Sequence, residues 1–107
     1  MHAEPTHDDP LSEGVQLFNA GAYWHAHEAW ERGWLTSHEP DTTLYKGIIQ
    51  AAAALVHWQR GNLKGLRRNW YKARPRLVAV VALPVDLEVA VFITAMDRFV
   101  LADGLVP

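Results

Sequence analysis

The sequence predicts an all-α protein, a single-domain bundle of about five helices whose third helix is buried. Apolar residues recur at helical spacing through most of the chain. Gly, Pro, Asn and Asp divide it into segments of helical length. The 107 residues, 50% of them hydrophobic, suffice for one core. We expect a flexible N-terminal arm over residues 1–9 and one helical domain over 10–107.

The first two helices are expected on either side of a glycine turn. Asp9 is a suitable N-cap, and Pro10 suits the first position of a helix. Gly21 can adopt the left-handed conformation that ends many helices, so the first helix should end just before it. A second helix is then expected over 22–35, followed by a polar loop over 36–41.

The third helix is expected over about 41–60. Residues 47–56 are apolar on every side except at Gln50, and a helix without a polar face belongs in the middle of a bundle. Gly61 should end this helix, and Asn62 should cap the next one.

The fourth helix is expected to be amphipathic. Its apolar stripe consists of Leu63, Leu66, Trp70, Ala73 and Leu77. Pro75 should end or kink this helix near Arg74. The run 77–83 is rich in β-branched residues, but a lone strand would have no partner, so we interpret it as a helix tail or an extended connector. Asp86 should cap a last helix that reaches about Leu101.

Charge is segregated along the chain. Residues 1–41 hold eight acids and one base, residues 42–76 hold eight bases and no acid, and residues 77–107 hold four acids and one base. The net charge is −2. Such a pattern predicts that the acidic and basic thirds pack together or form a dipolar surface.

Several classes of protein are excluded by composition. The chain has no Cys, which removes thiolate chemistry and disulfides and favours a cytoplasmic location. No apolar run approaches the ~18 residues of a membrane helix, and residues 1–5 lack the pattern of a signal peptide. We therefore expect no association with membranes.

One face of the second helix combines aromatic and ionisable side chains. The residues on this face are Tyr23, Trp24, His27, Glu28, Trp30, Glu31 and Trp34. We expect the aromatic rings to be buried, with Ala29 on the opposite, solvent-exposed side. Burying Glu31 would cost several kcal/mol without a compensating partner. Gln50 and His57 of the third helix offer such partners, so the two helices should face each other across a pocket formed by His27, Glu28, Glu31, Gln50 and His57.

Two interpretations of this pocket remain open. In the structural one, His27 pairs with Glu31, Gln50 bridges them, and Trp indole N–H groups complete the network. In the functional one, the pocket binds a small polar ligand or a divalent metal held by His27, Glu31 and His57. A His–Glu pair could also act as a general base, so hydrolytic activity is open as well, and whether the protein is an enzyme is undecided.

An alternative function uses the basic helix over 60–76. Lys64, Arg67 and Arg68 could contact anions there, and the helix could serve a protein-interaction module. Trp and Arg are enriched at interfaces, so the five Trp residues leave a homo-oligomer open. The acidic net charge and the lack of a base-reading motif argue against nucleic acid as the partner.

Four blocks within residues 18–65 resemble a known family. They are Phe18-Asn19-Ala20-Gly21-Ala22-Tyr23, Ala26-His27-Glu28-Ala29-Trp30-Glu31, Lys46-Gly47-Ile48-Ile49-Gln50-Ala51-Ala52 and Gly61-Asn62-Leu63-Lys64-Gly65. Together they resemble the domain of unknown function 309 family. The resemblance implies a small all-helical bundle but no activity, substrate or cofactor. It directs attention to His27, Glu28, Glu31, Gln50 and Asn62.

Overall fold

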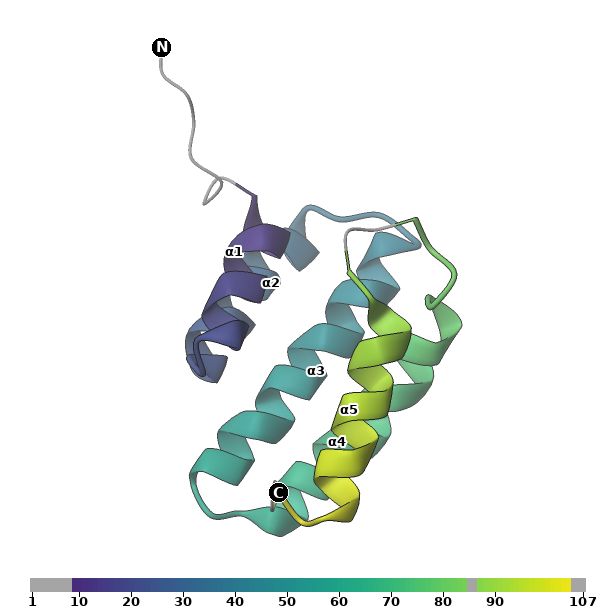
Figure 1. The fold of residues 1–107 in the computed structure, drawn as a ribbon. Helices are drawn as coiled ribbons and strands as arrows, with labels where there is room; N and C mark the ends of the chain where they lie inside the picture. The colour runs from purple at the N-terminus through teal and green to yellow at the C-terminus, as the bar shows by residue number, and fades with distance from the viewer. Residues whose placement is uncertain (1–8, 85–86, 105–107) are drawn as a thin grey trace.

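The computed structural model describes residues 9–84 and 87–104, and these form an all-α bundle. Its helices are α1 (Pro10–Asn19), α2 (Tyr23–Leu35), α3 (Asp41–Gln59), α4 (Leu63–Ala79) and α5 (Val89–Leu101). Figure 1 shows α3 between an α1–α2 hairpin and an α4–α5 hairpin. The predicted fold class and the buried third helix are therefore confirmed. Residues 1–8 of the expected arm lie outside the described residues.

Local sequence signals account for the ends of several helices. The Asp9 side chain accepts the backbone N–H two residues further on, at 3.1 Å, and so caps α1. Asn62 caps α4 in the same way by accepting the N–H three residues further on, at 2.8 Å. Gly21 and Gly61 follow α1 and α3 with φ of 81° and 75°, the left-handed conformation that glycine adopts without strain.

The fourth helix runs through Pro75 to Ala79, so the expectation that it ends near Arg74 is wrong. Pro75 lacks an N–H and leaves the carbonyl of Tyr71 without its helical partner. Both side chains are exposed, so this carbonyl lies on the solvent side of the helix, where water can bond to it. Continuing the helix places Leu77 in the core, where it is fully buried. The expected cap Asp86 lies outside the described residues, and α5 begins at Val89.

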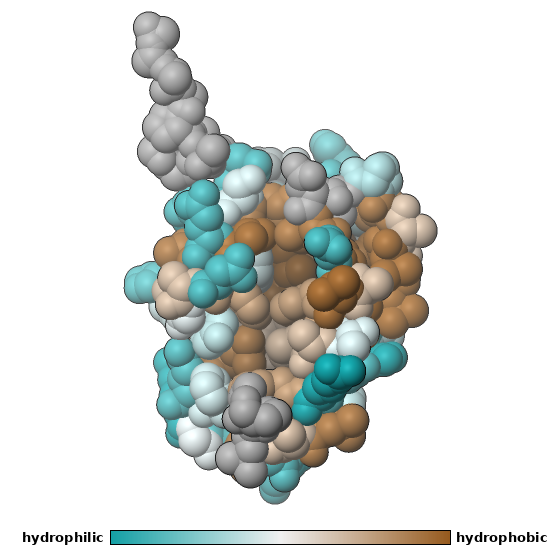
Figure 2. Space-filling view, viewed as in Figure 1, coloured by the Kyte–Doolittle hydropathy of each residue, from teal (hydrophilic) through white to brown (hydrophobic). Residues whose placement is uncertain are grey.

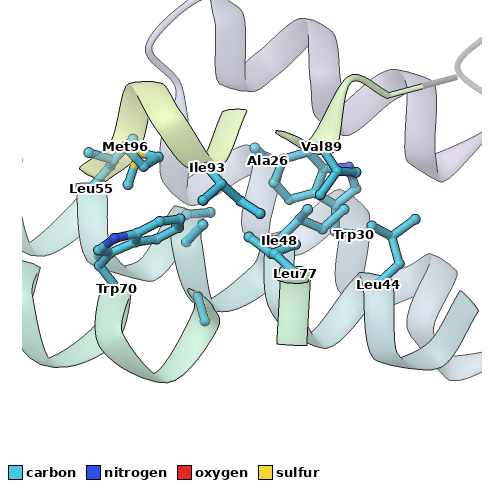
Figure 3. Packing of buried hydrophobic residues seen from close by; sticks show 14 of the residues in the cluster. Ala26, Trp30, Leu44, Ile48, Leu55, Trp70, Leu77, Val89, Ile93 and Met96 are labelled. Carbon is cyan, nitrogen blue, oxygen red and sulfur yellow. The ribbon is translucent and has the colours of Figure 1, made fainter. Parts of the chain in front are cut away.

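The core is assembled mainly from α2, α3, α4 and α5. Figure 3 shows Trp30, Ile48, Trp70, Leu77 and Met96 converging within it. Burial of one such large side chain contributes about 1.5–3 kcal/mol. The alanines of α3 at 51, 52 and 54 are fully buried, and their small size allows helices on both sides to approach closely. No helix within the described residues is long and apolar enough to cross a membrane.

The indole of Trp70 is buried with its polar atom satisfied. Its Nε1 donates to Asp97 Oδ1 at 2.8 Å. Arg74 binds the same carboxylate through Nε and Nη2 at 2.9–3.0 Å. Hydrogen bonding from Arg74 is the main reason that the pKa of Asp97 lies below its ordinary value. These contacts join α4 to α5 beside the core.

Candidate functional site

A polar groove of about 360 Å³ lies over α3 between α2 and α4. Its lining residues are His27, Glu31 and Trp34 of α2, Lys46, Ile49, Gln50 and Ala53 of α3, and Asn69 and Arg76 of α4. Groups that can donate or accept hydrogen bonds therefore converge from three helices. Small-molecule sites are usually clefts with a few convergent polar groups in a mostly apolar lining, and this groove has the convergent polar groups but a more polar lining.

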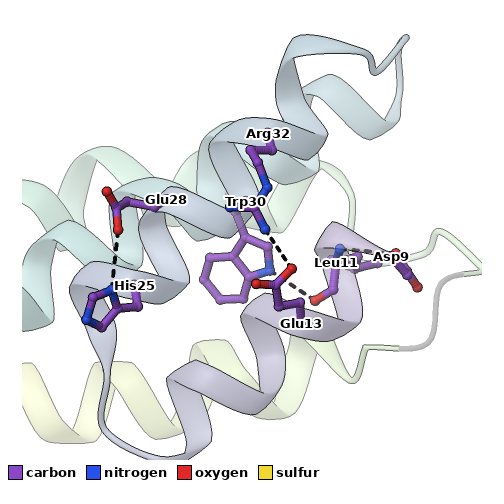
Figure 4. Close-up of polar contacts among 7 residues, drawn as sticks. All are labelled: Asp9, Leu11, Glu13, His25, Glu28, Trp30 and Arg32. Carbon is purple, nitrogen blue, oxygen red and sulfur yellow. Dashed lines mark hydrogen bonds and ion pairs between the residues drawn. The ribbon is translucent and has the colours of Figure 1, made fainter. Parts of the chain in front are cut away.

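The polar groove contains three of the residues expected in the pocket, His27, Glu31 and Gln50. Their convergence agrees with the expected packing of α2 against α3. Glu28 does not line the groove. It is exposed, and its Oε1 lies 3.3 Å from Nδ1 of His25 one turn earlier on α2 (Figure 4).

His57, in the last turn of α3, and Asn62, the cap of α4, do not line the groove. The amide Nδ2 of Asn62 lies 3.1 Å from Nδ1 of His57. A Cβ at Gly65 would overlap the His57 ring, so α4 begins close against this side chain. Within residues 9–84 and 87–104, no group of three or more His, Asp or Glu side chains could hold a metal. The expected metal set of His27, Glu31 and His57 is not assembled.

The burial of α2 differs from the expected helical wheel. Trp30 is buried, but Trp24 and Trp34 are 51% and 37% exposed. The Glu31 side chain is 53% exposed, so water hydrates its charge and the expected cost of burial does not arise. Ala29, expected to face solvent, is fully buried. The cause is that α1 packs against α2, so α2 has neighbours on two sides.

His27 occupies an unusual position at the groove. Its side chain is only 17% exposed, and its ring stacks on Trp24 with centroids 5.3 Å apart. The Nδ1 atom lies 3.5 Å from Glu31 Oε1, yet it is buried and makes no hydrogen bond. A buried polar atom without a partner costs about 1–3 kcal/mol. His27 is therefore not part of a fully satisfied network.

The His27–Glu31 contact is the one part of the expected network found among the described residues, and Gln50 and Trp30 have other partners. Gln50 Oε1 accepts a hydrogen bond from Arg76 Nη1 instead of bridging His27 and Glu31. The Trp30 Nε1 atom donates to the Leu11 carbonyl at 3.1 Å, away from the groove (Figure 4). The amide N–H groups of Gln50 and most of the N–H donors of the Arg76 guanidinium remain available to a bound molecule. Acceptors are available at Glu31, and a base at the His27 ring could take a proton from bound water.

Lys46, Asn69 and Arg76 complete the groove but were not identified as site residues from the sequence. Lys46 precedes Gln50 by four residues, so the two share a face of α3. Asn69 and Arg76 are seven residues apart and share a side of α4. Asn69 donates from Nδ2 to the carbonyl of Gly65 at 2.9 Å, which leaves its own carbonyl oxygen to accept.

The residues expected to contact anions through the basic helix are arranged differently. Lys64 and Arg68 are exposed on α4. Arg67 Nη1 pairs with Asp103 Oδ1 at 2.7 Å. In the described part of the chain, the ion pairs made by bases of residues 42–76 go to acids of the last third, and none joins the acidic first third. The acidic third does pack on the basic third, because α2 lies against α3, but no ion pair among the described residues joins the two thirds.

These features define a small helical-bundle protein with an open polar groove. Comparison with known families agrees with this class and identifies the family. The model of the domain of unknown function family DUF309 matches residues 11–69. This match spans more than half of the chain, so the protein belongs to that family, and the resemblance in the sequence is confirmed. The match includes Lys46, Gln50 and Asn69, whereas Arg76 lies beyond it. No curated protein and no solved structure matches the chain.

Proposed function

We propose that the protein binds in its polar groove a small molecule that carries an anionic group, such as a carboxylate or a phosphate. The observation that supports this most directly is the pair of cations, Lys46 and Arg76, that line the groove. Glu31 is the one acid among the lining residues, so the lining has a formal charge of +1 with His27 counted as neutral. A cleft with an excess of positive charge attracts anions.

Arg76 is held in place without being neutralised. Its partner is the uncharged Gln50, and in the described residues no carboxylate pairs with it. Two other arginines of α4, Arg67 and Arg74, are paired with carboxylates. A guanidinium that is oriented by a neutral partner keeps its charge for a ligand and loses less side-chain entropy on binding.

The wall formed by α2 suggests the rest of the ligand. Glu31 can accept hydrogen bonds from hydroxyl or amino groups. The proposed ligand therefore places its anionic group near α3 and α4 and its hydrogen-bond donors near α2.

Isothermal titration calorimetry tests this proposal with inorganic phosphate, glycerol phosphate and citrate as probes. We expect at least one probe to bind, and Arg76→Gln to weaken it about tenfold or more, because hydrogen bonds to charged groups contribute about 1.5–3 kcal/mol. Arg68→Gln is the matched control, because Arg68 is exposed on the same helix outside the groove.

The two substitutions also separate the groove from the basic helix. Equal weakening by Arg68→Gln and Arg76→Gln would assign anion binding to the surface of α4 and refute the groove. The groove proposal would also be refuted if no probe gave a binding signal at millimolar concentration. Lys46→Gln should weaken binding like Arg76→Gln, and Lys64→Gln should not, because Lys64 lies outside the lining.

A further inference from the structure

A second pocket, of about 120 Å³, lies between α1 and α5. Figure 2 shows hydrophobic atoms gathered in a hollow between these helices. The rings of Phe18, Trp30 and Phe92 and the side chains of Ile48 and Leu77 line it. We call it the apolar pocket. It shares no lining residue with the polar groove.

The pocket exists because α5 packs on α4 without extensive contact with α1. Phe18 of α1 and Phe92 of α5 meet edge to face with centroids 5.5 Å apart, and they join the two helices at the pocket wall. Phe18 also lies against Trp30, with centroids 5.7 Å apart. Ring edges and faces are therefore already arranged around the space, which suits an aromatic guest.

Two polar residues lie beside this apolar surface. Asn19 at the end of α1 and Glu88 at the start of α5 line the pocket, and both are exposed. Among the hydrogen bonds and ion pairs of the described residues, neither side chain takes part. The Glu88 carboxylate is thus available to a cation, and the Asn19 carbonyl to an N–H donor.

We propose that the apolar pocket binds a compact arylalkylamine, a molecule with one aromatic ring and a short ammonium arm. An apolar cavity of about 150 Å³ holds benzene. The pocket is slightly smaller but open to solvent, so a single ring fits while its substituent reaches the rim. There the ammonium group pairs with Glu88 and donates to Asn19, and the ring contacts Phe18, Trp30 and Phe92.

Calorimetric titration with benzylamine, benzyl alcohol and benzoate tests both parts of the proposal. These probes share one ring and differ in the charge of the arm. Benzylamine should bind about threefold more tightly than benzyl alcohol, the usual effect of a solvent-exposed ion pair, and benzoate should bind most weakly. In Glu88→Gln, benzylamine and benzyl alcohol should bind equally. Equal affinities of benzylamine and benzoate for the native protein would overturn the proposal.

A cavity-filling variant tests where the probes bind. Val15 of α1 lines the apolar pocket and is half-buried, so Val15→Phe should fill the space and weaken benzylamine at least tenfold. Val91→Phe is the matched control, since Val91 is 63% exposed and lies outside this pocket. Equal weakening by both variants, or no benzylamine binding to the native protein at millimolar concentration, would overturn the proposal. If Val15→Phe does not fold, the probe series and the Glu88→Gln variant still test whether the apolar pocket binds an arylalkylamine.

Discussion

Replacement of Gly14 by Ala is expected to disrupt the packing of α1 on α2. Gly14 is buried in α1, and a Cβ at this position would overlap Nε1 and Cδ1 of the Trp30 indole. Trp30 is itself buried, and its Nε1 donates to the Leu11 carbonyl at 3.1 Å (Figure 4). An added methyl group therefore forces the ring to move and breaks or weakens this hydrogen bond.

The expected loss of stability is the balance of one stabilising effect and two destabilising effects. Ala in the interior of a helix is favoured over Gly by about 0.5–1 kcal/mol. Overpacking costs about 1–3 kcal/mol, and leaving the buried Trp30 N–H without its acceptor costs about 1–3 kcal/mol. The balance for Gly14→Ala is a decrease of about 1–5 kcal/mol in the free energy of unfolding.

Urea denaturation followed by far-UV circular dichroism measures this change. Trp30→Phe provides the matched background, because it removes Nε1 and shortens the ring. In that background the cost of Gly14→Ala should fall by about 1 kcal/mol or more, the coupling expected of residues in contact. The reasoning is wrong if Gly14→Ala is as stable as the native protein, or if its cost is the same in both backgrounds.

Further predictions concern stability and its dependence on pH. Asp97→Ala leaves the buried Trp70 N–H without an acceptor and should cost about 1–3 kcal/mol, whereas Asp97→Asn retains an acceptor and should cost less in urea denaturation. Arg74 lowers the pKa of Asp97, so the advantage of the native protein over Asp97→Asn should be full above about pH 4. It should shrink as the pH falls through the folded-state pKa, and a constant advantage down to about pH 2 would contradict this. Burial, followed by nearby acids, raises the pKa of Tyr45, so the native protein should lose stability relative to Tyr45→Phe as the pH rises above about 10. Asn62→Ala removes the cap of α4 and should cost about 1 kcal/mol, measured by urea denaturation.

The helices were predictable where their signals are local. Asp9 and Asn62 cap through atoms two or three residues away, and Gly21 closes a turn through its own φ, so neighbouring residues suffice to predict them. Pro75 is different. The hydrogen bond that it removes from the helix is a local effect, but the burial that compensates for this loss involves residues distant in sequence. The helix continues past it because Leu77 gains burial among residues distant in sequence, and tertiary packing overrides the local preference.

The candidate site was predictable only where two helices adjacent in sequence meet. His27 and Gln50 were found because α2 and α3 form consecutive segments whose faces can be compared on helical wheels. Arg76 lies 26 residues beyond Gln50, and nothing in the spacing indicates that α4 returns to this side of α3. His57 was placed in the same pocket but does not line the groove, because a line of residues on α3 does not show where the groove ends. Ala29 was misplaced because a wheel assumes one buried face, whereas α2 packs against two helices.

The segregation of charge in the sequence has its clearest consequence at the polar groove. Where opposite charges stabilise this bundle they touch, as Arg74 and Asp97 do at 2.9 Å. Across the groove, Glu31 of the acidic third and Arg76 of the basic third line the same space, yet no ion pair between them is among the contacts of the described residues. Direct pairing would neutralise both charges and fill the groove with protein side chains. In the proposed binding mode, their separation leaves an acceptor on α2 and a donor on α4 for one ligand, and since exposed ion pairs add little stability, leaving these charges unpaired costs the fold little.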